Sequence, residues 1–177
     1  MAVHTVFEST NMRSTDGSER IFDCVATEDI DNGMIGGLGE LAEGMSHVYK
    51  FEKGAAEDHT FVIVDQPAWS ADTTRTVNQR RDAFYIPAGT VFRARVLART
   101  DEFGITKAGF TSDSAEQVKV GAYAVADASG RFKAQDDKPA SGSYCKIMRK
   151  RTLGSTLVTT AHTYGDTYEL YELRVIA

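Results

Sequence analysis

The residues best suited to chemistry lie scattered along this sequence, in no spacing typical of a catalytic or metal site. The four histidines, His4, His47, His59 and His162, form neither an H-x-H nor an H-E-x-x-H pattern, which are spacings that bring imidazoles to one metal ion. The G-x-S-x-G turn that presents a nucleophilic serine is absent as well. We therefore expect no catalytic residue, no metal and no cofactor, and interpret the chain as non-enzymatic.

One glycine-rich stretch, Gly37 to Ala42, fits the dinucleotide-binding pattern G-x-G-x-x-A. That pattern binds a nucleotide only where it follows a strand and opens a helix. Here the strand-like run His47–Glu52 follows almost at once and leaves no room for a helix of normal length. We interpret these glycines as a place where the backbone turns or closely approaches another segment.

The composition predicts a folded protein in water. Of its 177 residues, 42% are hydrophobic and 25% charged, which is ordinary for a globular domain. The net charge of −5 makes nucleic acid an improbable partner. The sequence starts without the basic and apolar segments of a signal peptide, and it contains no apolar run long enough for a membrane span. We therefore expect neither a membrane nor a nucleic acid as partner.

Two local features leave alternatives open. Cys24 and Cys145 form no C-x-x-C pair, and two free thiols in a reducing cytoplasm are favoured over one long-range disulfide. The basic run from Lys146 to Arg151 reads K-I-M-R-K-R. A solvated strand face is favoured there over a phosphate-binding strip.

Two-residue alternation dominates the sequence and predicts strands. Between Thr90 and Ala98, the apolar residues Phe92, Ala94 and Val96 fall on one face of a strand, and Arg93 and Arg95 fall on the other. Comparable runs rich in Val, Ile, Thr, Tyr and Phe occur at Arg20–Val25, His47–Glu52, Thr60–Val64, Val118–Val125, Tyr144–Arg149, Thr156–Thr160 and Thr167–Ile176. Turn residues separate them, which favours an all-β fold, a small β-barrel or β-sandwich with little helix.

In the last of these runs the apolar phase slips by one residue at Leu170–Tyr171. Either a β-bulge or burial of both strand faces accounts for the slip. Only Arg75 to Phe84 has helical character, because cap residues precede it and Pro87 follows it. A structured loop is the alternative there.

The first 19 residues are polar and irregular, and we expect an extended N-terminal arm. Residues 20–177 are expected to form a single β-rich domain. Two small lobes with a division near residues 135–143 are the alternative.

One tryptophan and four arginines are candidates for an interface with a partner protein. Trp69 follows a strand and a Pro-containing turn, where it either anchors a partner or caps the core. Arg93 and Arg95 share one strand face, and with Arg80 and Arg81 they could bind acidic groups of a partner. Solvated edge charge, which opposes aggregation, explains these arginines equally well.

The order of several segments along the chain resembles that of a known protein family. The stretch Ile30 to Leu41 looks like the N-G-x-I/V-x-x-L-G-x-L opening of small phage head proteins. Segments similar to theirs follow in the same order, namely Phe61–Val64, Phe84–Ala94, Asp101–Thr106, Val118–Tyr123 and Val125–Lys133. The chain thus resembles the capsid decoration, or cement, proteins of tailed bacteriophages over about residues 30–133. Its polar, Arg-rich loop Ser70 to Asp82 departs from their pattern.

This resemblance implies a β-barrel or sandwich body outside the mature capsid, made in the bacterial host cytoplasm and bound to the major capsid protein. It also implies a homo-oligomer, a trimer or a dimer on the capsid, without cofactor or catalytic residues. In such a protein the polar arm could order along the shell through Val6, Phe7, Met12 and Arg13.

Two other functions stay open. A tail-tube or tail-fibre component would also be β-rich and without catalytic residues, although a tube protein needs a long apolar stacking loop. A carbohydrate- or receptor-binding module would use exposed aromatic residues, for which Trp69 and Tyr123 are the candidates.

Overall fold

The structure is a computed structural model and describes residues 3–12, 21–54, 61–68, 80–154, 157–158, 163–164 and 167–176. It is all-β, as the sequence predicts, and it combines a closed barrel with a second sheet. The strands are β1 (Phe7–Asn11), β2 (Ile21–Val25), β3 (Ile35–Leu41), β4 (Val48–Lys53), β5 (Phe61–Val64), β6 (Val91–Val96), β7 (Glu102–Ile105), β8 (Tyr123–Ala126), β9 (Phe132–Gln135), β10 (Tyr144–Leu153), β11 (Leu157–Val158), β12 (Thr163–Tyr164) and β13 (Tyr168–Val175). The helical elements of the described residues are short 3-10 turns, η4 (Arg81–Ala83), η5 (Lys107–Gly109) and η6 (Ser112–Ser114).

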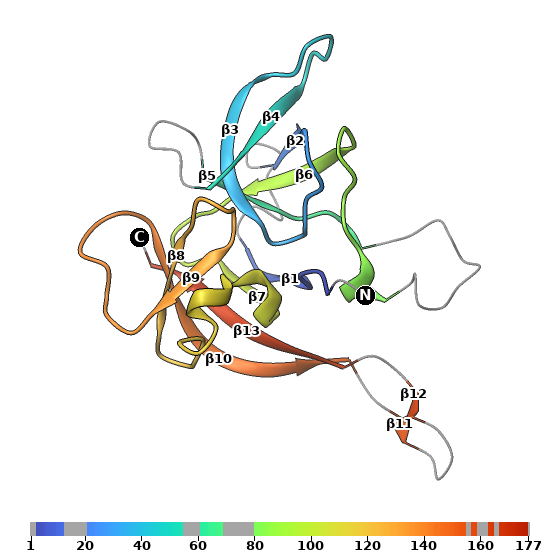
Figure 1. Cartoon of the computed structure of the whole chain (residues 1–177). Helices are drawn as coiled ribbons and strands as arrows, with labels where there is room; N and C mark the ends of the chain where they lie inside the picture. The colour runs from blue at the N-terminus through green and yellow to red at the C-terminus, as the bar shows by residue number, and fades with distance from the viewer. Residues whose placement is uncertain are drawn as a thin grey trace.

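The barrel forms the upper part of the molecule in Figure 1 and is closed in the order β2-β4-β3-β5-β6. All its strand pairs are antiparallel except β2 with β4. Its interior is filled by apolar side chains from every strand and from the loops between them, including Cys24, Leu38, Phe51, Val62 and Phe92. A small barrel closed in this way has no free sheet edge.

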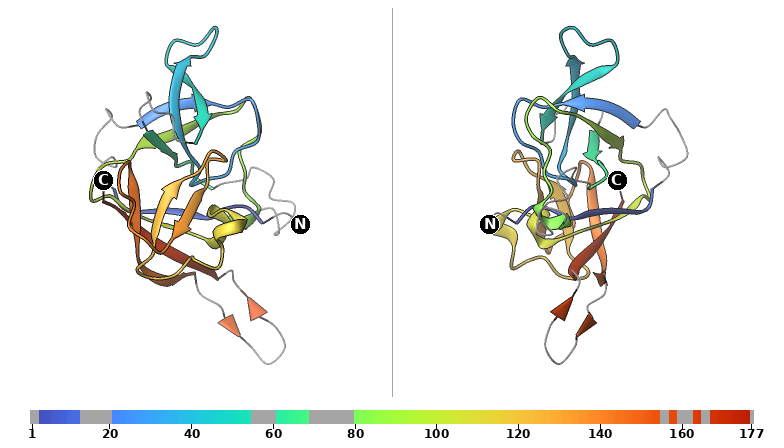
Figure 2. Two further views of the ribbon diagram at one scale, coloured as in Figure 1. Left: turned by 60° about the vertical axis from the view of Figure 1, so that its left-hand side comes forward. Right: turned by 90° about the vertical axis from the view of Figure 1, so that its right-hand side faces the viewer.

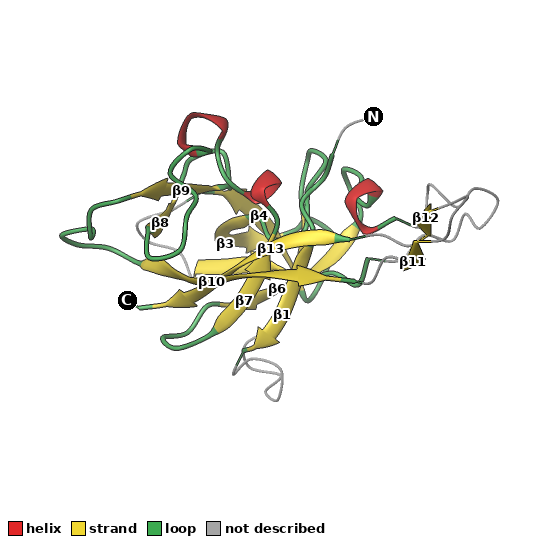
Figure 3. Ribbon diagram, turned by 90° about the horizontal axis from the view of Figure 1, so that it is seen from below, coloured by secondary structure: helices red, strands yellow, loops and turns green. Residues whose placement is uncertain are grey.

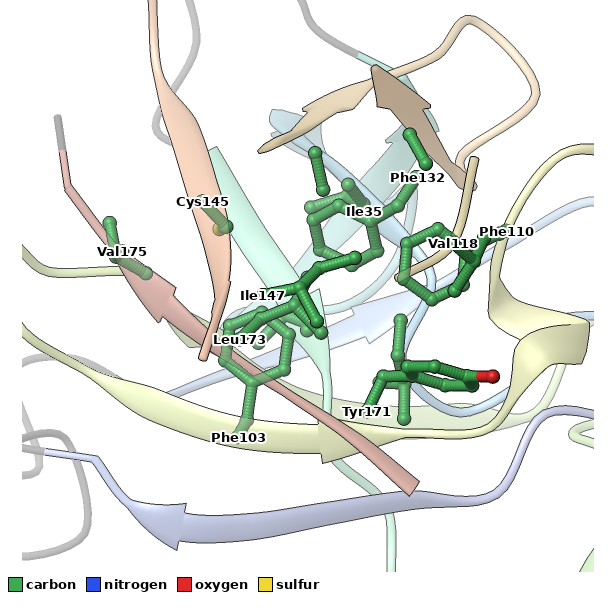
Figure 4. Packing of buried hydrophobic residues seen from close by; sticks show 14 of the residues in the cluster. Ile35, Phe103, Phe110, Val118, Phe132, Cys145, Ile147, Tyr171, Leu173 and Val175 are labelled. Carbon is green, nitrogen blue, oxygen red and sulfur yellow. The ribbon is translucent and has the colours of Figure 1, made fainter. Parts of the chain in front are cut away.

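The second sheet has six strands in the order β1-β7-β13-β10-β8-β9 and lies beneath the barrel, as Figures 1 and 3 show. One of its faces carries the larger apolar cluster, built around Phe103, Phe132, Ile147 and Leu173 (Figure 4). Ile35 of the barrel belongs to the same cluster. The barrel and the sheet therefore share a core, because the outer face of β3 and β5 packs on the inner face of the sheet.

The glycine-rich stretch forms the second part of β3, which ends at Leu41, and the chain then turns into β4 and not into a helix. A side chain at Gly39 would meet the carboxylate of Glu52 at 2.6 Å and the backbone carbonyl of Lys50 at 3.2 Å. The expected close approach of backbone is confirmed, since β4 passes too near for larger residues. The strand-to-helix turn that a dinucleotide needs is missing from this fully described stretch.

Alternation in the sequence identified the faces of β6 correctly. Phe92 and Ala94 are buried in the barrel, whereas Val91 and Arg93 are exposed on its outside. In β13 the phase slip is explained by burial on both faces, because Leu170 and Tyr171 are both buried. The bulge lies instead in the partner strand β10, between Ile147 and Arg149.

The prediction of an extended N-terminal arm is wrong for residues 3–12. Residues Phe7–Asn11 form β1, which pairs with β7 at the edge of the six-stranded sheet. Val6, Phe7 and Met12 are buried, and the ring of Phe7 lies 5.8 Å from that of Phe103. Their burial in the protein's own core keeps this segment on the body.

The alternative of two lobes divided near residues 135–143 is also wrong. β9 ends at Gln135 and β10 begins at Tyr144, and β8 pairs with both strands in one sheet. The barrel comes from residues 21–96, and the sheet combines β1 with strands from residues 102–175. Of the helical candidate, residues 75–79 lie outside the described residues, and the part from Arg80 on holds only the turn η4.

Candidate interaction surfaces

Three of the four residues predicted to contact a capsid have buried side chains. The side chains of Val6, Phe7 and Met12 are 2%, 9% and 3% exposed, respectively. These three side chains therefore cannot contact a partner unless they leave the core. Arg13 lies outside the described residues.

The predicted interface arginines lie in different environments. Arg80 donates two hydrogen bonds to Asp82, at 2.9 and 2.7 Å. Arg95 forms a largely buried ion pair with Asp65. Arg81 and Arg93 are exposed, and Arg81 lines the same groove as Asp65. The structure thus brings Arg81 and Arg95 to one region around Asp65, while Trp69 lies outside the described residues.

A buried aspartate ties three parts of the chain together. One carboxylate oxygen of Asp31 lies 2.6 Å from Nδ1 of His4, and the other accepts from Arg131 at 3.3 Å. The next residue, Asn32, exchanges two hydrogen bonds with the backbone of Gln66, at 2.7 and 3.0 Å. These contacts join the N-terminal segment, the barrel and the β8–β9 turn, so this polar cluster has a structural role.

A second charged cluster covers the outer face of the six-stranded sheet. Glu172 accepts hydrogen bonds from Arg149 and Arg151, and Arg151 also donates to Glu8 of β1. Burial by itself would raise the pKa of Glu172, but the hydrogen bonds and charges of the two arginines outweigh it and hold this pKa below its ordinary value. The glutamate is therefore ionised at neutral pH and fixes both arginines across the sheet.

The basic run of β10 agrees with the solvated-face interpretation. Arg149 and Lys150 are exposed, and Lys150 pairs with Glu169 at 2.8 Å. The ammonium of Lys146 lies 5.7 Å from the ring centre of Tyr123. Because acidic groups of this chain neutralise Arg149, Lys150 and Arg151, the strand offers little free positive charge to a phosphate.

Both cysteines are free, as expected, and both are buried. Cys24 belongs to the barrel interior and Cys145 to the core shared with the sheet. Burial raises the pKa of each thiol to about 12, and the nearby charge of Asp23 adds to the effect at Cys24. Both are therefore protonated at neutral pH and unsuited to nucleophilic chemistry.

The part of the chain that the structure describes holds no group of three His, Cys, Asp or Glu side chains that could bind a metal ion. No helix in that part has the length and apolar character to cross a membrane.

One surface was not predicted from the sequence, namely the tip of the β3–β4 hairpin, residues 41–47. The side chains of Leu41 and Met45 are 49% and 40% exposed there. The tip is held by hydrogen bonds from the Ala42 amide to Val48 at 2.8 Å and from the Met45 amide to Ala42 at 3.1 Å. Figures 1 and 2 show this hairpin projecting from the barrel, away from the six-stranded sheet.

Compared with protein-family models, curated proteins and solved structures, the chain matches none. The surfaces themselves therefore provide the basis for a functional proposal.

Proposed function

We propose that this chain is a non-enzymatic structural protein of a tailed-bacteriophage virion. It binds the outside of the mature capsid and stabilises the shell by bridging neighbouring major capsid subunits. The order of segments between residues 30 and 133 motivates the proposal, and the projecting β3–β4 hairpin is the observation that carries it. The capsid-bound form is a homo-oligomer, a dimer or a trimer.

The tip of this hairpin suits a protein contact. Leu41, the last residue of β3, and Met45, in the turn that follows, are exposed, and two backbone hydrogen bonds close this turn. Glu40 and Glu43 are exposed beside them. An ordered apolar contact point with a polar rim is typical of protein interfaces, since little conformational entropy is lost when it binds.

Bridging requires two contact surfaces that face apart. The short ribbon β11–β12 lies at the opposite end of the molecule from the tip of the β3–β4 hairpin, in all the views of Figures 1 and 2. One copy could therefore reach two neighbouring subunits of a shell. The net charge of −5 also suits a protein outside the shell, because it opposes adsorption to DNA.

Co-sedimentation with mature capsids stripped of this protein tests the proposal. We expect saturable binding at a copy number comparable to that of the major capsid protein, and greater resistance of the loaded shell to heat. The double variant Leu41→Asp/Met45→Asp should weaken binding about tenfold or more, as does the loss of central apolar anchors elsewhere. Val120→Asp, at a side chain 57% exposed on another surface, is the matched control.

Two results would contradict the decoration role. A few copies per particle would indicate a tail component or a component of a single vertex. No binding at all would favour a carbohydrate- or receptor-binding module.

A further inference from the structure

Among the described residues, the edge strand β1 has a strand neighbour on one side only, namely β7. In an antiparallel ladder, alternate residues direct both their N–H and C=O groups toward the neighbouring strand. The Thr106 amide donates to the Val6 carbonyl at 3.0 Å, and Glu8 lies opposite Gly104 in the same register. Val6 and Glu8 therefore face β7, and the amides and carbonyls of Phe7 and Ser9 point outward. Within the described residues, these outward groups have no hydrogen-bond partner.

A groove runs along this open edge, and we call it the β1 groove. Residues 5–9 line one side, residues 65–68 line the other, and Asn32 and Arg81 complete it. Its volume is about 340 Å³. The unpaired backbone groups thus border a hollow and not a flat surface.

The charges of the β1 groove favour an acidic occupant. Its two carboxylates are already engaged, because Glu8 pairs with Arg151 and Asp65 pairs with Arg95. Arg81 is exposed, and among the described residues the nearby carboxylates of Asp82, Asp65 and Glu8 pair with other arginines. As far as the described residues go, the groove therefore offers a positive charge without an ion-pair partner, in a protein whose net charge is −5.

We infer that the β1 groove binds an extended segment of the shell protein, which adds a strand to β1 and places an acidic side chain against Arg81. Backbone pairing with Phe7 and Ser9 supplies the affinity, and Arg81 sets the register and the charge preference. The source of the segment depends on the proposed function. The geometry of strand addition depends only on β1 and its groove.

Hydrogen exchange of the full chain, free and bound to stripped mature capsids, tests the backbone pairing. Binding should slow exchange of the outward amides at Phe7 and Ser9, measured on fragments covering residues 3–12. Unchanged exchange in this segment while the protein is bound would overturn the inference.

Two substitutions test the same contact through affinity. Ser9→Pro removes an outward N–H and should leave the β1–β7 ladder intact, since proline is tolerated where an edge strand faces solvent. It should weaken capsid binding about tenfold, because it removes one hydrogen bond and obstructs the incoming strand. Ser9→Ala keeps the N–H and is the matched control, expected to bind as the unmodified chain does. Equal melting temperatures establish that both variants are folded.

Arg81→Glu tests the charge preference. It should weaken capsid binding several-fold at low salt and less at high salt, because exposed charges are screened. Lys138→Glu makes the same charge change at an exposed site on the β9–β10 loop and should have no such effect.

The outcomes separate the two proposals. Capsid binding that Ser9→Pro does not weaken, with unchanged exchange at residues 3–12, overturns strand addition and leaves the decoration role standing. Absence of binding by the unmodified chain overturns both.

Discussion

The two edge strands of the six-stranded sheet, β9 and β1, differ in how their outward backbone groups are hydrogen-bonded. At the β9 edge, the Thr111 amide donates to the Phe132 carbonyl at 2.8 Å, and the Ala134 amide donates to the Ser114 hydroxyl at 3.0 Å. A parallel bridge between Phe110 and Phe132 completes this cover. At the β1 edge, no described residue bonds to the outward backbone groups. An open edge invites another strand, and folded proteins usually cover it.

The open edge is nevertheless firmly attached to the body. Phe7 and Met12 belong to the shared core, and Glu8 is linked through Arg151 to Glu172 across the outer face. Within the described part of the chain, β1 is therefore open in its hydrogen bonding but anchored through side chains on both faces. An edge that is ordered without a partner strand can accept one with little further loss of entropy.

Phe132→Ala should break the covered edge most severely. Phe132 is 1% exposed, and its ring lies 5.7 Å from that of Phe103 and 6.1 Å from that of Phe110. Removing it leaves a cavity where β9, its cover and β7 meet, at a cost of about 3–5 kcal/mol in the free energy of unfolding. Denaturant titration measures this loss, with Val120→Ala at an exposed site as control. A loss under about 1 kcal/mol would mean that this cluster can collapse around the gap.

Ser114→Ala should open the covered edge without removing the core. The hydroxyl of Ser114 accepts from Ala134 and lies 2.8 Å from that of Thr111, and the residue is 1% exposed. Its loss leaves a buried amide unpaired, which costs about 1–3 kcal/mol. We expect faster hydrogen exchange at Ala134 and lower stability, whereas Ser112→Ala, an exposed control in the same turn, should change neither. Unchanged exchange at Ala134 would show that the β9 edge is protected by other contacts.

Local patterning was sufficient to predict two features of the barrel. Strict alternation over Thr90–Ala98 predicted the faces of β6, and the glycine-rich stretch from Gly37 predicted the close approach that β4 makes at Gly39. Both signals are contained in a few consecutive residues. They do not depend on which strands become neighbours.

The six-stranded sheet and the exposed surfaces could not be predicted, because they depend on contacts between residues far apart in the sequence. β1 reads as a polar arm because Glu8, Ser9, Thr10 and Asn11 follow one another, and an edge strand needs few apolar residues on a single face. Its ion pair with Arg151 spans 143 positions of sequence. The expected strand Val118–Val125 was partly wrong, since β8 begins only at Tyr123. The exposed Leu41 and Met45 gave no signal, because exposure is not visible in residue type.

Glu172→Gln should loosen the anchor of the open edge and have the smallest effect of these changes. The substitution preserves the shape of the side chain but removes the charge that Arg149 and Arg151 share, at a cost of about 1–2 kcal/mol near neutral pH. Exchange at the Glu8 amide, which faces β7, should become faster. Glu169→Gln is the control, because Glu169 pairs with Lys150 in solvent, where such pairs contribute little.

The stabilisation that Glu172 provides should depend on pH. Because the pKa of Glu172 is lowered in the folded protein, its stabilisation is present above the ordinary glutamate pKa of about 4.3 and is lost as pH falls through the lower folded value. The difference in unfolding free energy between the unmodified chain and Glu172→Gln should therefore be constant from pH 7 to about pH 5 and shrink at lower pH. Denaturant titrations across this range measure it. A difference that does not change with pH would indicate that Glu172 acts by packing, and that β1 is held by its apolar face alone.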